Sequence, residues 1–82
     1  MWTNADGLEL LNKLSGSLSH DEMIVIKTGP DGDLYDLLVS NGFYDDAGQT
    51  LTDEGADLIE ELESEPGGED FEEKIDDFFL FI

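Results

Sequence analysis

The chain has 82 residues, of which 22 are acidic and three are lysines, so its formal net charge is −19. This charge excludes direct binding to nucleic-acid phosphates and to anionic membrane surfaces, because both depend on lysine and arginine side chains. The chain has no cysteine and only one histidine, which excludes disulfides, thiolate zinc sites and His-rich metal centres, and we expect no cofactor.

The first predicted helix covers residues 4–15 and follows a polar cap at Thr3 or Asn4. Leucines recur along it at the spacing that gathers side chains on one face of a helix. These leucines are Leu8, Leu11 and Leu14, with Leu10 beside them. Gly16 ends the helix, and we expect its leucine face to pack in the core.

Residues 20–27 fit two different structures. Ser19 and Glu22 form the Ser-x-x-Glu pattern of a capping box, in which each side chain accepts a hydrogen bond from the other residue's N–H. The apolar and largely β-branched run Met23–Ile26 would also suit a buried strand. We expect a helix, because the cap is specific and the strand has no obvious partner in the sequence.

Turn residues at 29–32 lead into a third predicted helix, which begins at about Asp33. Asn41 and Gly42 end it, because both residue types tolerate a left-handed backbone. The apolar face of this helix contains Leu34, Leu37 and Leu38.

A short β-hairpin and a fourth helix are predicted next. Residues 43–44 and 50–51 flank a tip that contains Gly48, which is the pattern of a hairpin. Thr52 can cap a helix over residues 53–64. The inward-facing side chains of that helix are Leu58, Ile59 and Leu62.

The last predicted helix follows the break at residues 66–68 and runs from about Glu69 to near the C-terminus. Its apolar stripe contains Phe71, Ile75, Phe78 and Ile82. Phe79 and Phe81 lie off this stripe, so the end of the chain is apolar nearly all round. We expect this end to be buried in the core, and the alternative is a contact with a second copy or a partner.

Together these elements predict an α+β fold that is mostly helical, with about four to five helices and one small β-hairpin, in a single domain over residues 1–82. Their order resembles a winged helix-turn-helix domain, most closely over residues 33–63. The matching residues are Leu37, Leu38, Gly42 and Phe43, followed by Leu51, Thr52, Glu54 and Gly55. The resemblance implies a winged-helix-like core over residues 1–65 and a C-terminal helix over residues 69–82.

Winged-helix regulators bring arginine and lysine to DNA on the third helix and the wing. Here those positions carry Asp33, Asp36, Asp45 and Asp46, and no basic residue lies between positions 28 and 73. The DNA-binding function of the family therefore does not carry over, because the charge has the opposite sign.

The acidity is concentrated after residue 30: residues 1–30 have a net charge of −2 and residues 31–82 a net charge of −17. Residues 53–65 contain seven acids, and in a helix they would span ~20 Å. One charge per ~3 Å is close to the spacing of one phosphate per 3.4 Å along a DNA strand. A helix over residues 53–64 would therefore have a linear charge density close to that of a nucleic-acid strand.

Enzyme chemistry has no clear signature in the sequence. Nucleophile triads, phosphate-binding loops and nucleotide fingerprints are missing from it. Neither Asp31 nor Asp45 begins a calcium loop, because the glycine and glutamate that such a loop needs are not at the required positions. We therefore expect that the protein is not an enzyme.

In size and composition the chain resembles small phage or mobile-element inhibitors that imitate DNA, such as anti-CRISPR proteins, antirestriction proteins and inhibitors of DNA-repair enzymes. The resemblance implies that it occupies the basic groove of a nucleic-acid-binding protein, such as a CRISPR effector or a restriction or repair enzyme, as a monomer or a homodimer. The candidate partner-binding residues are Asp33, Asp36, Asp45, Asp46, Asp57, Glu60 and Glu61.

The alternative is an acidic, winged-helix-like protein–protein interaction domain from a halophilic organism, with no DNA binding. Acidity for solubility at high salt explains the few lysines, but it explains the uneven distribution of charge less well. The first residues have neither the basic nor the apolar region of a signal peptide, so we expect a cytoplasmic location, in the host cell if a phage encodes the protein.

Overall fold

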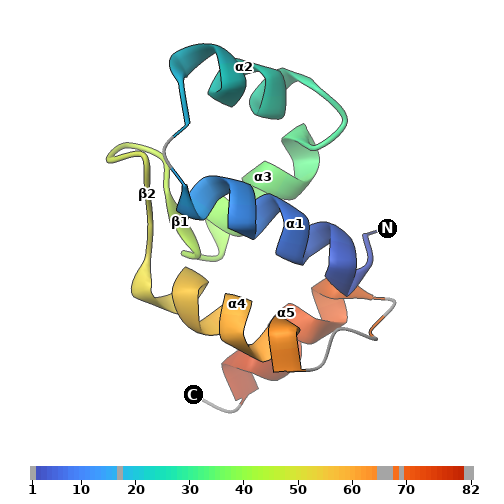
Figure 1. Ribbon diagram of the computed structural model, residues 1–82. Helices are drawn as coiled ribbons and strands as arrows, with labels where there is room; N and C mark the ends of the chain where they lie inside the picture. The colour runs from blue at the N-terminus through green and yellow to red at the C-terminus, as the bar shows by residue number, and fades with distance from the viewer. Residues whose placement is uncertain (1, 17, 65–67, 69, 81–82) are drawn as a thin grey trace.

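The computed structural model describes residues 2–16, 18–64, 68 and 70–80, and within them the chain forms five helices and one two-stranded antiparallel hairpin (Figure 1). The helices are α1 (Asn4–Ser15), α2 (His20–Thr28), α3 (Gly32–Ser40), α4 (Asp53–Ser64) and α5 (Phe71–Leu80). The strands are β1 (Tyr44–Asp45) and β2 (Thr50–Leu51). The prediction of a mostly helical α+β fold with one small hairpin is confirmed.

Capping boxes begin the first two helices. The Thr3 hydroxyl accepts a hydrogen bond from the N–H of Asp6 at 3.2 Å, and the Asp6 carboxylate accepts one from the N–H of Thr3 at 3.1 Å. Ser19 and Glu22 form the same pair of bonds at 3.2 and 3.3 Å. The second box satisfies backbone donors at the start of α2, and the segment that also suited a strand is a helix.

The connection from α3 to α4 depends on two local features. Gly42 follows α3 with φ +81°, a left-handed conformation that glycine adopts without steric cost. The hairpin pairs Tyr44 with Leu51, and the Thr52 hydroxyl then caps α4 by accepting from the N–H of Gly55 at 3.1 Å. The predicted ends of these elements are confirmed to within a residue, including the start of α3, which lies at Gly32 and not at Asp33.

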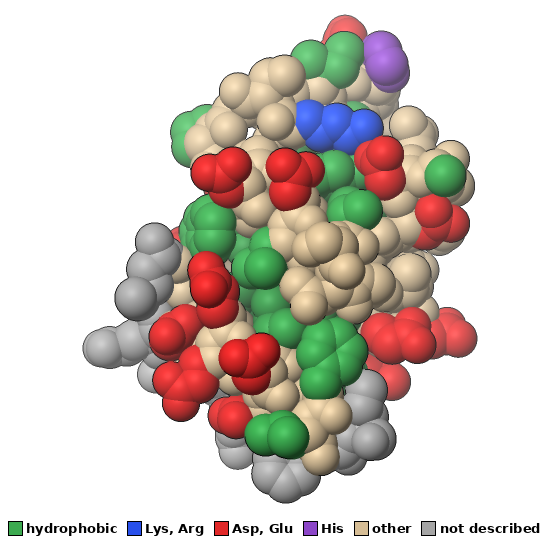
Figure 2. Space-filling view, turned by 180° about the vertical axis from the view of Figure 1, so that it is seen from behind, with side chains coloured by type: hydrophobic (Ala, Val, Ile, Leu, Met, Phe, Trp, Pro, Cys, Tyr) green, Lys and Arg blue, Asp and Glu red, His purple; other side chains and the backbone are tan. Residues whose placement is uncertain are grey.

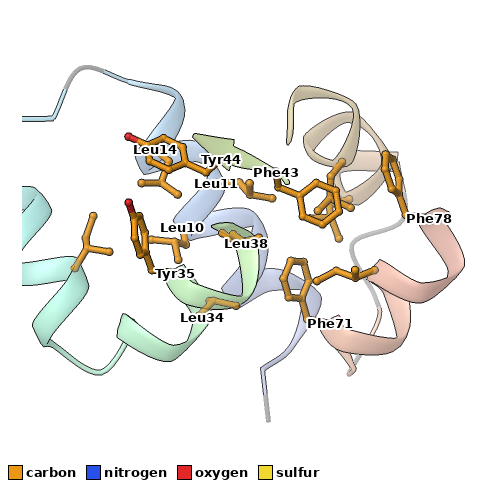
Figure 3. Packing of buried hydrophobic residues seen from close by; sticks show 14 of the residues in the cluster. Leu10, Leu11, Leu14, Leu34, Tyr35, Leu38, Phe43, Tyr44, Phe71 and Phe78 are labelled. Carbon is orange, nitrogen blue, oxygen red and sulfur yellow. The ribbon is translucent and has the colours of Figure 1, made fainter. Parts of the chain in front are cut away.

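The hydrophobic core has two ends with different aromatic residues, and leucines of α1 and α3 lie between them (Figure 3). At one end Tyr35 of α3 and Tyr44 of β1 meet edge to face, with ring centroids 5.7 Å apart. At the other end lie Phe43, which follows α3, and Phe71 and Phe78 of α5. We call these regions the tyrosine end and the phenylalanine end.

At the phenylalanine end, glycines allow close packing. A Cβ atom at Gly7 of α1 would overlap the ring of Phe71, and one at Gly55 of α4 would overlap the carbonyl oxygen of Phe43. The N–H of Phe71 also donates to the carbonyl of Trp2 at 2.9 Å, which fixes the start of α5 against the beginning of the chain. Both α4 and α5 therefore pack against α1.

The C-terminal helix differs from the prediction in two respects. It begins at Phe71, two residues after the predicted start, and Asp70 caps it by accepting from the N–H of Glu73 at 3.2 Å. Phe79 is 40% exposed although it stacks on Phe43, and Leu80 is 78% exposed, so the expected burial of this end is wrong for both residues. A helix that packs one face on the core leaves its other face in solvent. The predictions for Glu69, Phe81 and Ile82 lie outside the described residues.

Candidate partner-binding surface

All seven carboxylates predicted to bind a partner are exposed: Asp33, Asp36, Asp45, Asp46, Asp57, Glu60 and Glu61. The structure does not gather them into one patch. Figure 1 shows α3 and the hairpin tip on one side of α1 and α4 on the other. Figure 2 shows acidic side chains in separate groups toward the two ends of one face, with hydrophobic and uncharged side chains between them.

The first group, which we call the tip group, consists of Asp33 and Asp36 on α3 with Asp45 and Asp46 of the hairpin. Strand β1 packs beside α3, and the charges of Asp36 and Asp46 both contribute to raising the pKa of Tyr35, which places them around the same ring. Asp45 accepts a hydrogen bond from the N–H of Gly48 at 3.2 Å and so shapes the turn at the tip.

Within the tip group, Asp46 already has partners in its own chain. Its Oδ1 accepts a hydrogen bond from the hydroxyl of Tyr35 and lies 2.9 Å from Nζ of Lys27. Lys27 also lies over the ring of Tyr35, 5.5 Å from its centroid, and Tyr44 packs against that ring from β1. We call Lys27, Tyr35, Tyr44 and Asp46 the Asp46 cluster; it joins α2, α3 and the hairpin.

The pKa values in the Asp46 cluster follow from these contacts. Burial and the hydrogen bond to Asp46 raise the pKa of Tyr35 well above its usual range, and burial raises the pKa of Tyr44. The hydrogen bond from Tyr35, followed by the interaction with Lys27, lowers the pKa of Asp46. At neutral pH Asp46 is therefore ionised and the two tyrosines are neutral. The side chain of Asp46 is 48% exposed, so a partner can reach it.

The second group, which we call the α4 group, consists of Asp57, Glu60 and Glu61 on the exposed side of α4. Glu61 lies 3.3 Å from Nζ of Lys74 on α5, which links the two helices. The whole of α4 has six exposed acids in 12 residues: Asp53, Glu54, Asp57, Glu60, Glu61 and Glu63. Over a helix axis of ~18 Å this is one charge per ~3 Å. The predicted seventh acid, Glu65, lies outside the described residues.

Each of the three lysines of the chain lies beside a carboxylate. Lys13 is 3.5 Å from Glu9, while Lys27 and Lys74 pair with Asp46 and Glu61 as described. Three cations cannot balance 22 acids, so most of the acidic surface has no counterion in its own chain. Asp33, Asp36 and Asp57 are exposed members of this surface.

The structure also shows a surface feature that the sequence prediction overlooked. Met23 and Ile26 of α2 are buried, whereas Ile24 is 44% exposed and Val25 is 68% exposed. The helical period of the sequence could have predicted this exposure, because two residues that lie between core-facing residues 23 and 26 must face outward. The run Met23–Ile26 is therefore apolar on both sides of α2.

Among the described residues, no three histidine or acidic side chains come close enough together to hold a metal ion. Within the same residues, no helix combines the length and the apolar composition needed to cross a bilayer. No protein-family model, curated protein or solved structure significantly matches the chain.

Proposed function

We propose that the protein is an acidic DNA mimic that inhibits a nucleic-acid-binding protein, of the anti-CRISPR, antirestriction or repair-inhibitor type, in the cytoplasm. The observation that carries this proposal is a dense set of exposed carboxylates that the three lysines of the chain cannot neutralise. The tip group and the α4 group take the place of phosphates in the basic groove of the partner. Arginine and lysine side chains of that groove pair with them.

The energetics of α4 support a functional reason for the charge. Like charges at i, i+3 and i+4, such as Asp57 and Glu61, destabilise a helix by a few tenths of a kcal/mol per pair. Lysines at some of these positions would remove this cost, yet α4 contains none. Binding to a cationic groove would convert the repulsion into attraction and would steer the two proteins together.

Competition with DNA tests the proposal directly. We expect the protein to displace a labelled duplex from at least one member of a panel of purified CRISPR effectors, restriction enzymes and repair enzymes. The displacement should weaken steeply as salt concentration rises, because the contacts are between exposed charges. If no member of the panel releases DNA at low salt, the mimic proposal is wrong, and the halophilic interaction domain becomes the better interpretation.

A charge-reversal pair tests which carboxylates contact the partner. We expect the double variant Asp33→Lys, Asp36→Lys to lose competition by at least about tenfold, since two attractive contacts become repulsive. The control is Asp76→Lys with Asp77→Lys on α5, which makes the same charge change on exposed residues outside both groups. Equal losses in the two variants would show a general effect of net charge and would contradict an assigned surface.

Asp46 is a poor choice for that test. Lysine at this position would face Lys27 and would remove the acceptor for the hydroxyl of Tyr35. A loss of competition in an Asp46→Lys variant would therefore mix a binding effect with damage to the fold. The Asp33 and Asp36 side chains are exposed on α3 and take no part in the hydrogen bond or the ion pair of Asp46, so reversing them keeps both partners of Asp46 in place.

A further inference from the structure

Helix α2 packs on α3 and leaves its other side toward the C-terminal end of α1. There an open groove of about 370 Å³ lies between the two helices. This volume is at the lower end of the ~300–1,000 Å³ range of ligand sites and suits a few side chains better than a cofactor. The groove is lined by Lys13, Leu18, Asp21, Glu22, Val25 and Ile26.

The groove is lined by an apolar residue, Val25, that the core does not require. Val25 is 68% exposed, so the core gains little from it. A β-branched residue also lowers helix propensity compared with alanine or lysine, and its methyl groups lie against water. Leu18, half-buried against the core, and Ile26 extend the same apolar surface. A partner that covers Val25 would recover this cost.

The rim of the groove is acidic. Asp21 and Glu22 lie in the first turn of α2, and the capping box with Ser19 holds the Glu22 side chain in place. Lys13 on the opposite wall lies 3.5 Å from Glu9, which offsets its charge. An apolar side chain enters such a groove most favourably when lysine or arginine flanks it in its own chain.

We propose that this groove binds an amphipathic helix of a partner protein, with an aliphatic side chain in the groove and lysines or arginines against Asp21 and Glu22. A second copy of the chain fits poorly, because it would bring another charge of −19 and a second acidic rim to the same place. The site goes beyond the proposed DNA mimicry, because it does not require a partner that binds nucleic acid. Each of the two proposals can therefore fail without the other.

A pair of synthetic peptides provides the probe. The first is a lysine-rich helical peptide with leucines at i, i+3, i+4 and i+7, and the second has alanine at those positions and the same charge. We expect the leucine peptide to shift the NMR amide signals of Leu18, Val25 and Ile26, and to bind about tenfold more tightly than the alanine peptide. Equal affinities, or shifts confined to α4 and α5, would overturn the proposal.

Two matched variants separate apolar docking from electrostatic attraction. We expect Val25→Asp to weaken binding of the leucine peptide about tenfold, although its added negative charge should attract a basic peptide. Ile24→Asp adds the same charge one residue away, on a side chain that does not line the groove, and should leave affinity unchanged or slightly raised. Unchanged affinity in Val25→Asp would overturn the proposal.

Two further measurements test whether the variants fold and whether the protein forms a dimer through the groove. Ile24 and Val25 are both exposed, so circular dichroism should show that the Val25→Asp and Ile24→Asp variants are folded. If Val25→Asp unfolds, the Val25→Ala variant, which adds no charge, should still weaken binding of the leucine peptide. Sedimentation should show a wild-type monomer at concentrations where the peptide binds. A dimer that Val25→Asp dissociates would assign the groove to a second copy and overturn the proposal.

Discussion

The tyrosine end and the phenylalanine end of the core bury aromatic rings of similar size in different surroundings. Phe43 and Phe78 meet edge to face with centroids 5.5 Å apart, much as Tyr35 and Tyr44 do at 5.7 Å. At the phenylalanine end the neighbours are apolar side chains and closely packed backbone. At the tyrosine end a buried ring ends in a hydroxyl that reaches the surface ion pair of Asp46 and Lys27.

The difference shows that this highly charged chain uses apolar packing at one end of its core and adds polar contacts between elements at the other end. Apolar packing contributes stability that does not depend on the ionisation of side chains, and the phenylalanine end supplies such packing. The Asp46 cluster adds an ion pair and a hydrogen bond that connect α2 and α3 to the hairpin. The contacts at the tyrosine end therefore include groups that titrate, whereas the apolar packing at the phenylalanine end does not depend on ionisation.

The largest expected effect is at the phenylalanine end. Phe71→Ala should lower the free energy of unfolding by about 3–5 kcal/mol, because the ring is fully buried against Gly7 and its removal leaves a cavity. Urea unfolding followed by circular dichroism measures this change. Phe79→Ala, at a ring that is 40% exposed, is the control and should cost clearly less. Similar losses in the two variants would contradict the packing described for α5.

A smaller effect is expected at the tyrosine end. Tyr35→Phe keeps the ring and removes the hydroxyl that donates to Asp46, so the melting temperature should fall by only a few degrees. The variant should also resist alkali better. Because the pKa of Tyr35 is raised in the folded protein, the neutral hydroxyl contributes stability that is fully present below the usual tyrosine pKa of ~10. This stability is lost as the pH rises from there toward the pKa of Tyr35 in the folded protein. Thermal melts at neutral and alkaline pH would measure both effects, and an equal alkaline loss in wild type and variant would contradict this role.

The smallest expected effect is in acid. The pKa of Asp46 is lowered in the folded protein, so its ionised form contributes stability that is present above the usual aspartate pKa of ~3.9 and is lost as pH falls through the folded value. The difference in unfolding free energy between wild type and Asp46→Asn should therefore shrink as the pH falls. Comparing the two proteins cancels the general relief of repulsion among the other carboxylates. A constant difference across the acid range would mean that the charge of Asp46 does not stabilise the fold.

Features that depend on neighbouring residues were predictable from the sequence. The capping pattern at Ser19 and Glu22 identified a helix correctly, although the apolar residues after it suited a strand. Helical spacing also identified buried residues such as Leu34 and Leu58. Such signals depend on hydrogen bonds and side-chain directions within one or two turns.

Features that join distant segments were not predictable. Lys27 and Asp46 are far apart in the sequence, and no local rule connects a lysine at the end of one helix with an aspartate in a hairpin tip. The same limit applies to the seven candidate carboxylates. The sequence could name them as candidate partner-binding residues, but only the fold shows that α1 lies between the tip group and the α4 group.

The ion pair between Lys27 and Asp46 joins the nearly neutral first part of the chain to the strongly acidic remainder, and salt acts on it in the direction opposite to its effect on the whole molecule. Added salt relieves the repulsion among the many carboxylates, which favours the folded state. The same ions weaken an attraction between two side chains that are 38% and 48% exposed. We therefore expect the protein to become harder to unfold as ionic strength rises, while the ion pair between α2 and the hairpin weakens.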